Sequence, residues 1–463
     1  MRKLCLLVIL VFTITMFLFL IGAAQSTKEI TTISFWTPLT TEADKVVHSK
    51  LIEKFETENP DIKVVPEYVS HKDWFTRWMT AIVSKQTPNL ALCNTSQSAW
   101  LYEQNMSLPL EDLVNEIDPN KTEFVYSRST IPAFQTPDGH IWAIPFVVNI
   151  NALWYRKDLL AEAGISPDSI KTWDDLYKAA EKISSPPDLY GIGMALTREL
   201  GAQQMLFVWT NANNGDLFSP ETGAYQFDDP ETRQKAKEAL EFLKKLYVNG
   251  ILPPGVSTWI WNDYRLAMAK GKLVFTCSWG GDVGVARDQN PSMLENLSVM
   301  PYPSGPSADT YPPFHDASGW AWALIKNEDK DKIDAAMKWL RFFFEPDNVA
   351  LATTARPVYN IPVLKSVLTS PVFLQDPTTN MFKEEIKFLY EEILPLTRRA
   401  GTEAGPTPIV AVYAAELFPS DAVQNYLFGD WDVDQSLDWL DSKFKELFKN
   451  VDYPYEEGPF PKK

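Results

Sequence analysis

Short apolar runs alternate with amphipathic stretches in the first part of the chain. The pattern predicts a strand at 30–36, a helix at 43–58, a strand at 61–69, a helix at 72–85 and a strand at 90–93. Pro60 stands where the first of these helices must end. Because strands and helices alternate, we expect a parallel, doubly wound α/β sheet.

The alternation resumes after Pro145 and continues through the middle of the chain. It predicts an apolar stretch at 146–155, a helix at 172–183, a helix from 229–230 to 250, a strand within 268–277 and a helix at 331–345. Thr172, with Asp175 three residues later, has the pattern of a helix N-cap. Residues 301–317 are rich in Pro, Ser and Asp and predict a loop that crosses between lobes. The pattern beyond residue 383 is mainly helical, and 463 residues exceed what one core organises, so we expect two domains.

The N-terminal segment has the layout of a secretory signal. Arg2 and Lys3 precede an apolar run from residue 4 to residue 21, and small residues up to Ala24 suit cleavage before Gln25. The competing interpretation is an uncleaved anchor, since about 18 apolar residues approach the length that spans a bilayer. We expect export and cleavage near Ala24, with the mature protein in the periplasm or outside the cell.

The composition makes several classes of function improbable. The formal net charge is −17, and loss of the signal would remove two basic residues and make the protein more acidic still. An acidic surface repels phosphate backbones and anionic headgroups, so we expect no nucleic-acid partner and no peripheral membrane role. Cys93 and Cys277 would remain after cleavage, which is too few for a disulfide framework. Their spacing does not indicate a bond between them, and we do not expect one.

Motifs of the common catalytic sites are missing. Neither Gly271-Lys272 nor any other segment has the spacing of a phosphate-binding loop, and no Gly-x-Ser-x-Gly elbow occurs. Four isolated histidines lack metal-ligand spacing: His48, His71, His140 and His315. We therefore expect no cofactor, no metal and no enzymatic activity. A secreted glycosidase is the enzyme alternative, but 60 acidic residues will always include some suitably spaced pair.

A series of segments in order along the chain resembles the family 1 extracellular solute-binding proteins, the group that contains maltose-binding proteins. The segments are ISFWTPL at 33–39, LIEKFETENPDIKVVPEY at 51–68, TPNLALCN at 87–94, LPLEDL at 108–113, DGHIWAIPFVVNINALWYRKDLLAEAGI at 138–165, TWDDLYKAA at 172–180, YRLAMAKGK at 264–272, GWAWALIK at 319–326, AAMKWLRFFFEPDN at 335–348 and NIPVLKS at 360–366. The chain departs from the family pattern at Arg156, at Asn89 and at Ser278–Asp282, where the family has Gly-x-Trp.

The resemblance implies two doubly wound α/β lobes joined by crossing strands, with the ligand in the cleft between them, as in type II periplasmic binding proteins. The first lobe would comprise 25–148 and 301–370, and the second 149–300 and 371–463. It also implies a monomer that captures a carbohydrate and delivers it to the membrane-embedded permease subunits of an ABC importer.

Candidate ligand contacts follow from two sources. Ligands of open α/β sheets lie beyond the carboxyl ends of strands, which favours Trp36 after the first predicted strand and Asn94 and Ser96 after the third. The resemblance adds Asn149, Trp209, Trp279, Asp282, Trp320 and Arg356. An indole packs on the apolar face of a sugar ring, and amide, carboxylate and guanidinium groups pair with its hydroxyls.

Each candidate also has a structural alternative. The tryptophans, with Trp259 and Trp261, are common core residues, and Asn94, Ser96 and Asn149 are common helix caps or turn residues. An arginine such as Arg356 more often forms a surface ion pair than a contact with a ligand. Arg398-Arg399 is either a solvated basic pair or a site for an anion such as an acidic sugar or a glycerol phosphate derivative, which leaves a charged ligand as the alternative to a neutral oligosaccharide.

Overall fold

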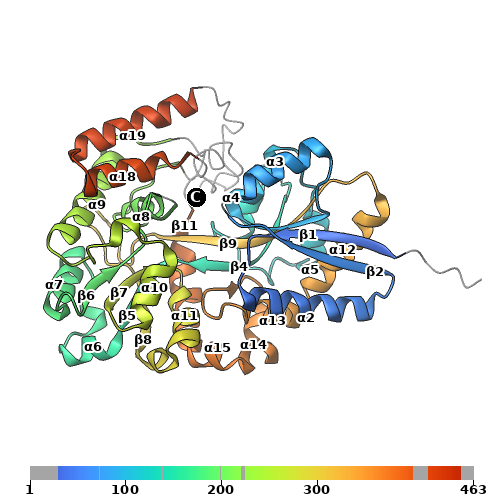
Figure 1. The fold of residues 1–463 in the computed structure, drawn as a ribbon, viewed down its shortest axis with the longest axis horizontal. Coiled ribbons are helices and arrows are strands. Elements are labelled where there is room, and N and C mark those ends of the chain that lie inside the picture. The colour runs from blue at the N-terminus through green and yellow to red at the C-terminus, as the bar shows by residue number, and fades with distance from the viewer. Residues whose placement is uncertain are drawn as a thin grey trace, which may run out of the picture.

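The structure is a computed structural model that describes residues 30–71, 73–136, 139–198, 200–219, 225–399 and 416–449. The predicted signal segment lies outside these residues. Figure 1 shows the described chain as two groups of helices and strands, with β4 and β9 running between them. Within the described ranges, no helix has both the length and the apolar character needed to cross a membrane.

The first sheet takes strands from well-separated parts of the chain. Its order is β10 (Ile361–Pro362), β4 (Ile144–Ile150), β9 (His315–Leu324), β3 (Leu90–Asn94), β1 (Thr31–Thr37) and β2 (Ile62–Tyr68), with β11 (Thr397–Arg398) beside β9. β1 runs parallel to β2 and β3, as the alternating pattern predicts. β9 is antiparallel to β3 and β4, so the sheet as a whole is mixed, which the alternating pattern of the first strands did not predict. The reason is that β9 arrives through a loop from the other sheet rather than through a helical crossover.

Helices cover this sheet on both faces. They are α2 (Glu42–Glu58), α3 (Trp74–Ser84), α4 (Thr95–Glu103), α5 (Glu111–Ile117), α12 (Lys330–Phe343) and α13 (Pro346–Thr353). Side chains of β1 alternate between the faces, so Phe35 packs against Trp339 of α12, at 5.9 Å between ring centroids, while Trp36 packs against Trp78 of α3, at 5.0 Å. The high tryptophan content thus serves the core on both sides of the sheet.

The second sheet has the order β6 (Tyr190–Gly193), β7 (Leu273–Ser278), β5 (Ala152–Arg156) and β8 (Leu297–Met300). Its helices are α6 (Lys157–Glu162), α7 (Trp173–Ile183), α8 (Leu200–Asn211), α9 (Pro230–Val248), α10 (Trp261–Ala269), α11 (Gly281–Gln289), α18 (Phe418–Phe428) and α19 (Val433–Phe448). Thr172 caps α7 by accepting a hydrogen bond from the backbone N–H of Asp175, which confirms the predicted helix start.

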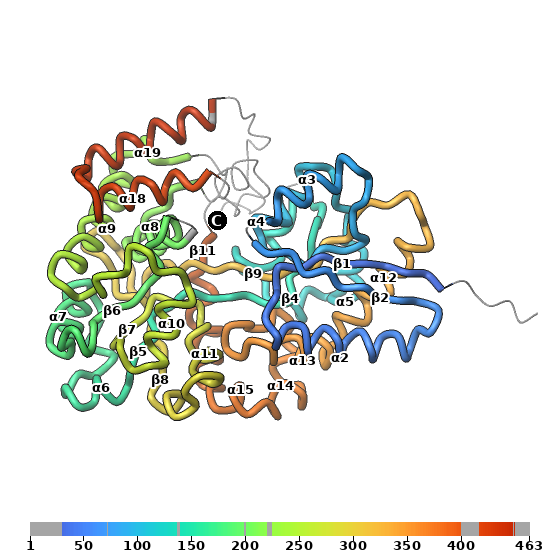
Figure 2. The backbone as a smooth tube through the Cα atoms, viewed as in Figure 1, coloured from blue at the N-terminus to red at the C-terminus, as the bar shows by residue number. Residues whose placement is uncertain are grey.

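The chain crosses between the sheets in two clearly defined places. β4 continues directly into β5 through Asn151, and the segment at 301–314 leads from β8 back to β9 (Figure 2). The Tyr302 hydroxyl donates a hydrogen bond to the Asn151 side chain, which ties the two crossings together. The predicted crossing loop at 301–317 is therefore confirmed for most of its length, but β9 already begins at His315.

Short helices complete the architecture near these crossings. They are α14 (Pro371–Gln375), α15 (Pro377–Met381) and α16 (Lys383–Phe388), with a π-helical turn at Leu389–Ile393 and 3₁₀ turns at Ile131–Phe134, Pro167–Ser169, Val256–Thr258, Pro291–Asn296, Lys365–Thr369 and Leu394–Leu396. Phe382 contacts Trp154 of β5, with 6.2 Å between ring centroids. The exact residues at which the two lobes divide stay a prediction.

The two cysteines lie in different sheets. Cys93 belongs to β3 and Cys277 to β7, and both are buried free thiols. Burial raises the pKa of the Cys277 thiol to about 12 and that of Cys93 further still. Both thiols are therefore protonated at neutral pH and act as small apolar side chains.

Candidate functional site

A cavity of about 510 Å³ lies where strands of both sheets end. On one side it is lined by the residues that follow β1 and β3, and on the other by α8, α10 and the turn after β7. The crossing strands β4 and β9 contribute Asn149, Ser318 and Trp320 to its floor. The cavity is therefore bounded by both groups of elements seen in Figure 1.

Six of the nine predicted contacts line this cavity. They are Asn94, Ser96, Asn149, Trp279, Trp320 and Arg356. These residues come from five separate segments, so the fold rather than the sequence brings them together. Ligand contact by these six residues stays a prediction.

Trp36 does not line the cavity. β1 extends to Thr37, one residue further than predicted, so Trp36 is still inside the strand and turns toward α3. Its Nε1 donates a hydrogen bond to Glu67 at 3.0 Å, and the Arg77 guanidinium lies 4.9 Å from its ring centroid. The cavity is lined instead by residues beyond the strand end, beginning with Pro38.

Trp209 lies in the core of the second group. Its side chain is fully buried, and its ring packs against Trp173, Phe242 and Tyr302 at centroid distances of 5.6, 5.1 and 5.4 Å. α8 presents a different face to the cavity, so the predicted position of Trp209 at the cavity is wrong.

Asp282 also lies outside the cavity lining. It is in the first turn of α11, fully buried, and accepts a hydrogen bond from the Thr276 hydroxyl at 3.1 Å. Burial raises the pKa of its carboxyl group. Asp282 therefore lies behind the side chains that line the cavity, and the prediction that it faces the ligand cleft is corrected.

Two of the lining amides already have structural partners. Asn94 caps α4 by accepting from the backbone N–H of Gln97 at 2.9 Å. Asn149 donates to the carbonyl of Tyr359 at 2.7 Å and to Asn360 Oδ1 at 3.3 Å. One polar atom of each side-chain amide thus forms hydrogen bonds within the fold, as the structural alternative predicts. The other polar atom of each amide is left for a ligand.

Arg356 is held by a buried carboxylate. Its Nε and Nη2 atoms donate to the two oxygens of Asp44 at 3.0 and 2.5 Å, and Asp44 is 1% exposed. Burial by itself would raise the pKa of Asp44, but Arg356 and the hydrogen bonds from Thr41 outweigh it, so the pKa is lowered. The ion-pair alternative is therefore confirmed for Arg356, although the same side chain lines the cavity.

A second buried carboxylate, Asp316 on β9, joins two lining side chains. It accepts from Trp279 Nε1 at 3.1 Å and from Arg399 Nη1 at 3.2 and 3.3 Å. Arg399 is therefore no solvated surface residue, and neither is Arg398, which pairs with Asp216 and lies over the ring of Phe314.

Sequence reasoning missed most of the cavity wall formed by the helices. α8 contributes Gln203, Gln204 and Phe207, and α10 contributes Trp261, Asn262 and Arg265. Both sets have the spacing i, i+1, i+4, which is one face of a helix. Trp261, expected in the core or at the rim, is half-buried and donates from Nε1 to Gln204 Oε1 at 3.2 Å. The sequence signal that could have indicated this wall is the i, i+1, i+4 spacing of polar and aromatic residues, which occurs in both α8 and α10.

Three lining side chains carry buried polar atoms without a partner among the described residues. They are Nε1 of Trp320, whose side chain is 4% exposed, Oε1 of Gln203, which is 2% exposed, and Nε of Arg265. A buried polar atom left unpaired costs about 1 to 3 kcal/mol, so such atoms commonly mark a place for a ligand or a water molecule. Two are donors and one is an acceptor, which suits a hydroxyl-bearing ligand.

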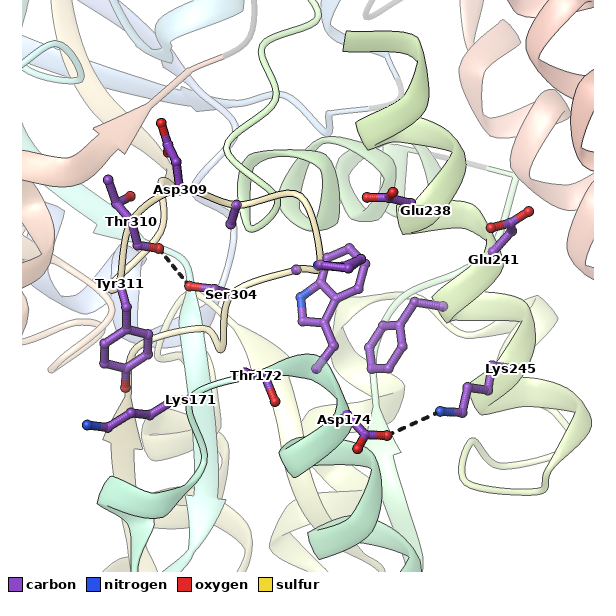
Figure 3. Close-up of a pocket in the computed structure, with 15 residues that line it drawn as sticks. Lys171, Thr172, Asp174, Glu238, Glu241, Lys245, Ser304, Asp309, Thr310 and Tyr311 are labelled. Carbon is purple, nitrogen blue, oxygen red and sulfur yellow. Dashed lines mark hydrogen bonds and ion pairs between the residues drawn. The ribbon is translucent and has the colours of Figure 1, made fainter. Parts of the chain in front are cut away.

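A second hollow, of about 730 Å³, lies at the start of α7 beside α9 and the 304–311 loop (Figure 3). Its polar groups bind one another: Ser304 donates to the Thr310 carbonyl at 2.8 Å, and Lys245 lies 3.7 Å from Asp174. It is lined by α7, α9 and part of the 301–314 crossing segment, with no residue of the first sheet or its helices, so a ligand there would not bridge the two groups. Within the described ranges, no cluster of three or more metal-ligating side chains occurs at either hollow.

Comparisons with known proteins agree with this arrangement. Residues 37–350 match the family model described as bacterial extracellular solute-binding protein. The ABC transporter periplasmic-binding protein YcjN of Escherichia coli K12 is 25% identical over 352 residues, which cover 75% of this chain and 77% of that protein. The sn-glycerol-3-phosphate-binding periplasmic protein UgpB of the same organism is 25% identical over 342 residues, covering 72% and 74%.

Solved structures share the fold. Maltose-bound MalE3 of T. maritima superposes with a TM-score of 0.75 at 21% identity, covering 90% of this chain and 100% of that one. A solute-binding protein of Thermotoga lettingae bound with α-D-tagatose gives a TM-score of 0.72 at 18% identity, covering 90% and 99%. Since the family model spans more than half of the chain, the protein belongs to the bacterial extracellular solute-binding proteins, which bind a solute and do not catalyse a reaction.

Proposed function

We propose that the protein captures a carbohydrate in the cavity between its two sheets and delivers it to the permease subunits of an ABC importer. It would act as a monomer outside the cytoplasm. The observation that carries the proposal is the cavity lining, which combines indole rings with amide, hydroxyl and guanidinium groups and contains buried polar atoms still in need of partners.

The chemistry of the lining suits a sugar. Trp261, Trp279 and Trp320 offer aromatic surface for the C–H face of a pyranose ring. Asn94, Gln203 and other amides offer both donors and acceptors for its hydroxyl groups. A volume of about 510 Å³ has room for more than one sugar ring. These features support an oligosaccharide, and the bound maltose, tagatose and laminaribiose of structurally similar proteins are consistent with it.

A charged ligand such as a glycerol phosphate derivative is the second candidate. Three arginines line the cavity, namely Arg265, Arg356 and Arg399, and none of the described lining residues is acidic. The resemblance to UgpB, described as sn-glycerol-3-phosphate-binding, favours the same class. Arg356 and Arg399 already pair with aspartates, however, so most of this positive charge is balanced.

A thermal-shift panel tests the proposal. Mono- and oligosaccharides, with sn-glycerol 3-phosphate beside them, would be added to the mature protein. A ligand at 100 times its dissociation constant stabilises the native state by about 2.7 kcal/mol, which should raise the melting temperature by about 3 to 5 °C. A shift from glycerol phosphate alone would replace the carbohydrate by the second candidate, and no shift from any sugar would contradict the proposal.

A matched pair of tryptophan variants places the ligand in the cavity. Trp261→Ala should reduce or abolish the shift because its ring forms part of the cavity wall. Trp431→Ala removes a tryptophan of similar exposure that packs against Trp439, outside the cavity lining, and should leave the shift unchanged. Equal shifts in both variants would mean that the sugar binds elsewhere.

A further inference from the structure

The charge of the cavity lining differs from that of the whole chain. The protein carries a formal net charge of −17, yet the described lining contains three arginines and no aspartate or glutamate. A cationic side chain that is shielded from water is costly unless an anionic group pairs with it. The balance can come from a carboxylate behind the lining or from the ligand.

Two of the arginines are balanced from behind. Arg356 binds both oxygens of Asp44, and Arg399 lies 3.2 Å from Asp316. Each of these aspartates is at most 3% exposed, so each guanidinium faces the cavity with its charge already paired.

Arg265 on α10 has no such pair. Among the described residues no carboxylate lies within 4.0 Å of it, and its Nε atom has no hydrogen-bond partner. The guanidinium lies 5.6 Å from the ring centroids of both Tyr264 and Tyr359, so aromatic side chains fix its position without neutralising it.

The backbone makes room for this guanidinium. A Cβ atom at Gly281 would come within 2.4 Å of Arg265 Cζ, so any larger residue at position 281 would push the guanidinium away. Asp282, the next residue, is the acidic group whose charge acts on Arg265, but its Oδ1 accepts from Thr276 and its Oδ2 has no partner. Among the described residues, no hydrogen bond and no ion pair within 4.0 Å therefore joins Asp282 to Arg265.

We propose that Arg265 makes the cavity selective for an anionic ligand. It would bind one carboxylate or phosphate group of an acidic sugar or sugar phosphate. The inference rests on the proposed carbohydrate function and narrows it to sugars that carry one anionic group. A guanidinium binds either group through paired, charge-assisted hydrogen bonds, so the two sources share one chemistry.

Isothermal titration calorimetry with matched triplets of sugars tests the inference. Each triplet has a neutral, a uronic acid and a 6-phosphate form: glucose, glucuronate and glucose 6-phosphate; the galactose series; and cellobiose with its acidic forms. At least one anionic member should bind about tenfold or more tighter than its neutral counterpart, and added salt should weaken only the anionic member. Comparison of the uronate with the phosphate identifies the anionic group.

Variants locate the effect at Arg265. Arg265→Gln should remove the preference for the anionic sugar over its neutral counterpart, while Arg265→Lys should retain part of that preference. Gly281→Ala should weaken anion binding by displacing the guanidinium. Arg341→Gln, which removes an exposed arginine of α12 that pairs with Glu116 of α5 outside the cavity lining, is the control and should change nothing. Unfolding midpoints of all variants show whether each one is folded.

The outcomes separate the two proposals. Neutral and anionic sugars of equal affinity, or an anion preference that survives in a folded Arg265→Gln variant, would overturn the role of Arg265 and leave carbohydrate binding intact. Binding of sn-glycerol 3-phosphate alone, lost in Arg265→Gln, would keep the anion role of Arg265 and overturn the carbohydrate. If no probe bound, both proposals would be contradicted.

Discussion

Asp44 has two structural tasks. It completes a capping box at the start of α2, where it accepts from the backbone N–H of Thr41 at 3.0 Å, and it holds Arg356 at the cavity. Burial alone would raise the pKa of Asp44, but the charge of Arg356 and the hydrogen bonds that the carboxylate accepts stabilise its charged form and lower the pKa. The same residue therefore links the stability of α2 to the shape of the binding site.

Replacement of Asp44 by Asn should destabilise the protein by about 2 kcal/mol at neutral pH. The full cost of breaking a buried ion pair is about 3 to 5 kcal/mol, but Arg356 is partly exposed and water replaces some of the loss. Since the folded pKa lies below the unfolded value of about 3.9, the benefit of the wild-type carboxylate is complete above that value and disappears as the pH falls through the folded pKa. Urea unfolding of both proteins should therefore show a difference at pH 7 that narrows in acid. Asp430→Asn, at an exposed position, is the control, and an equal effect of the two substitutions would contradict the account.

Buried histidines give the fold a second dependence on pH. His315 is fully buried, its Nε2 accepts from the backbone N–H of Tyr302 at 3.0 Å, and its Nδ1 lies 2.9 Å from the carbonyl of Pro313. These contacts require the neutral ring with the proton on Nδ1. Burial lowers the pKa of His315 to about 4, and that of His48 likewise.

The stability should accordingly fall between pH 6.5 and pH 4. In that range the unfolded chain binds protons at these histidines and the folded chain does not, so each histidine contributes a slope of about 1.4 kcal/mol per pH unit. His315→Asn retains a donor toward Pro313 but does not titrate, and its free energy of unfolding should depend less steeply on pH by that amount. Urea unfolding at pH 7, 6 and 5 measures the slopes. The account fails if His315→Asn keeps the wild-type slope.

At the level of elements, α8 has one face that packs in the core and another face that lines the cavity. Trp209 faces the core of the second group, while Gln203 and Phe207 face the cavity. Trp209→Phe should lower the free energy of unfolding by about 2 kcal/mol, since part of a large buried side chain is lost, and should leave ligand affinity unchanged. Gln203→Ala should weaken ligand binding by about five- to tenfold with little change in stability, because its buried Oε1 is free for a ligand hydroxyl. Chemical unfolding and calorimetry on both variants measure the two effects, and a loss of affinity in Trp209→Phe alone would reverse these assignments.

The helices and strands were easier to predict from the sequence than the site. Helix starts have local causes, so Thr172 and Asp175 predict their cap from sequence alone. Strand order is not local: β9 lies antiparallel beside β3 and β4 because of a distant crossing segment, which the pattern of the first strands could not predict. Which face of a helix meets the cavity also depends on distant elements, and so Trp209 was favoured and its neighbours on α8 were missed.

At single positions, the success of the site prediction depended on the exact residue at which a strand ends. The rule that ligands lie beyond strand ends was sound, since Asn94 and Ser96 line the cavity. It failed for Trp36 because β1 continues to Thr37 and alternate side chains of a strand point to opposite faces. A shift of one residue thus moves a side chain from the cavity into the core, and no sequence pattern fixes a strand end so closely.

For the whole molecule, the cavity wall is divided between two groups of elements that the chain connects through a few crossings. Direct connections run through Asn151 and through the 301–314 segment. A ligand that contacts both walls gains contacts when the walls approach, so it should favour a closed arrangement in proportion to its difference in affinity for the two states.

Small-angle X-ray scattering should detect this closure. A compact chain of this length has a radius of gyration of about 22 Å, and the bound form should be smaller than the free form, with a narrower distribution of interatomic distances. A sugar that produces no thermal shift should leave the scattering curve unchanged, which controls for the effect of sugar on the solvent. Trp261→Ala removes a contact from the second wall only, so its curve at the same sugar concentration should remain that of the free protein. Identical curves for the free and fully bound wild-type protein would show that the ligand binds without closure and that the two walls are already in their final positions.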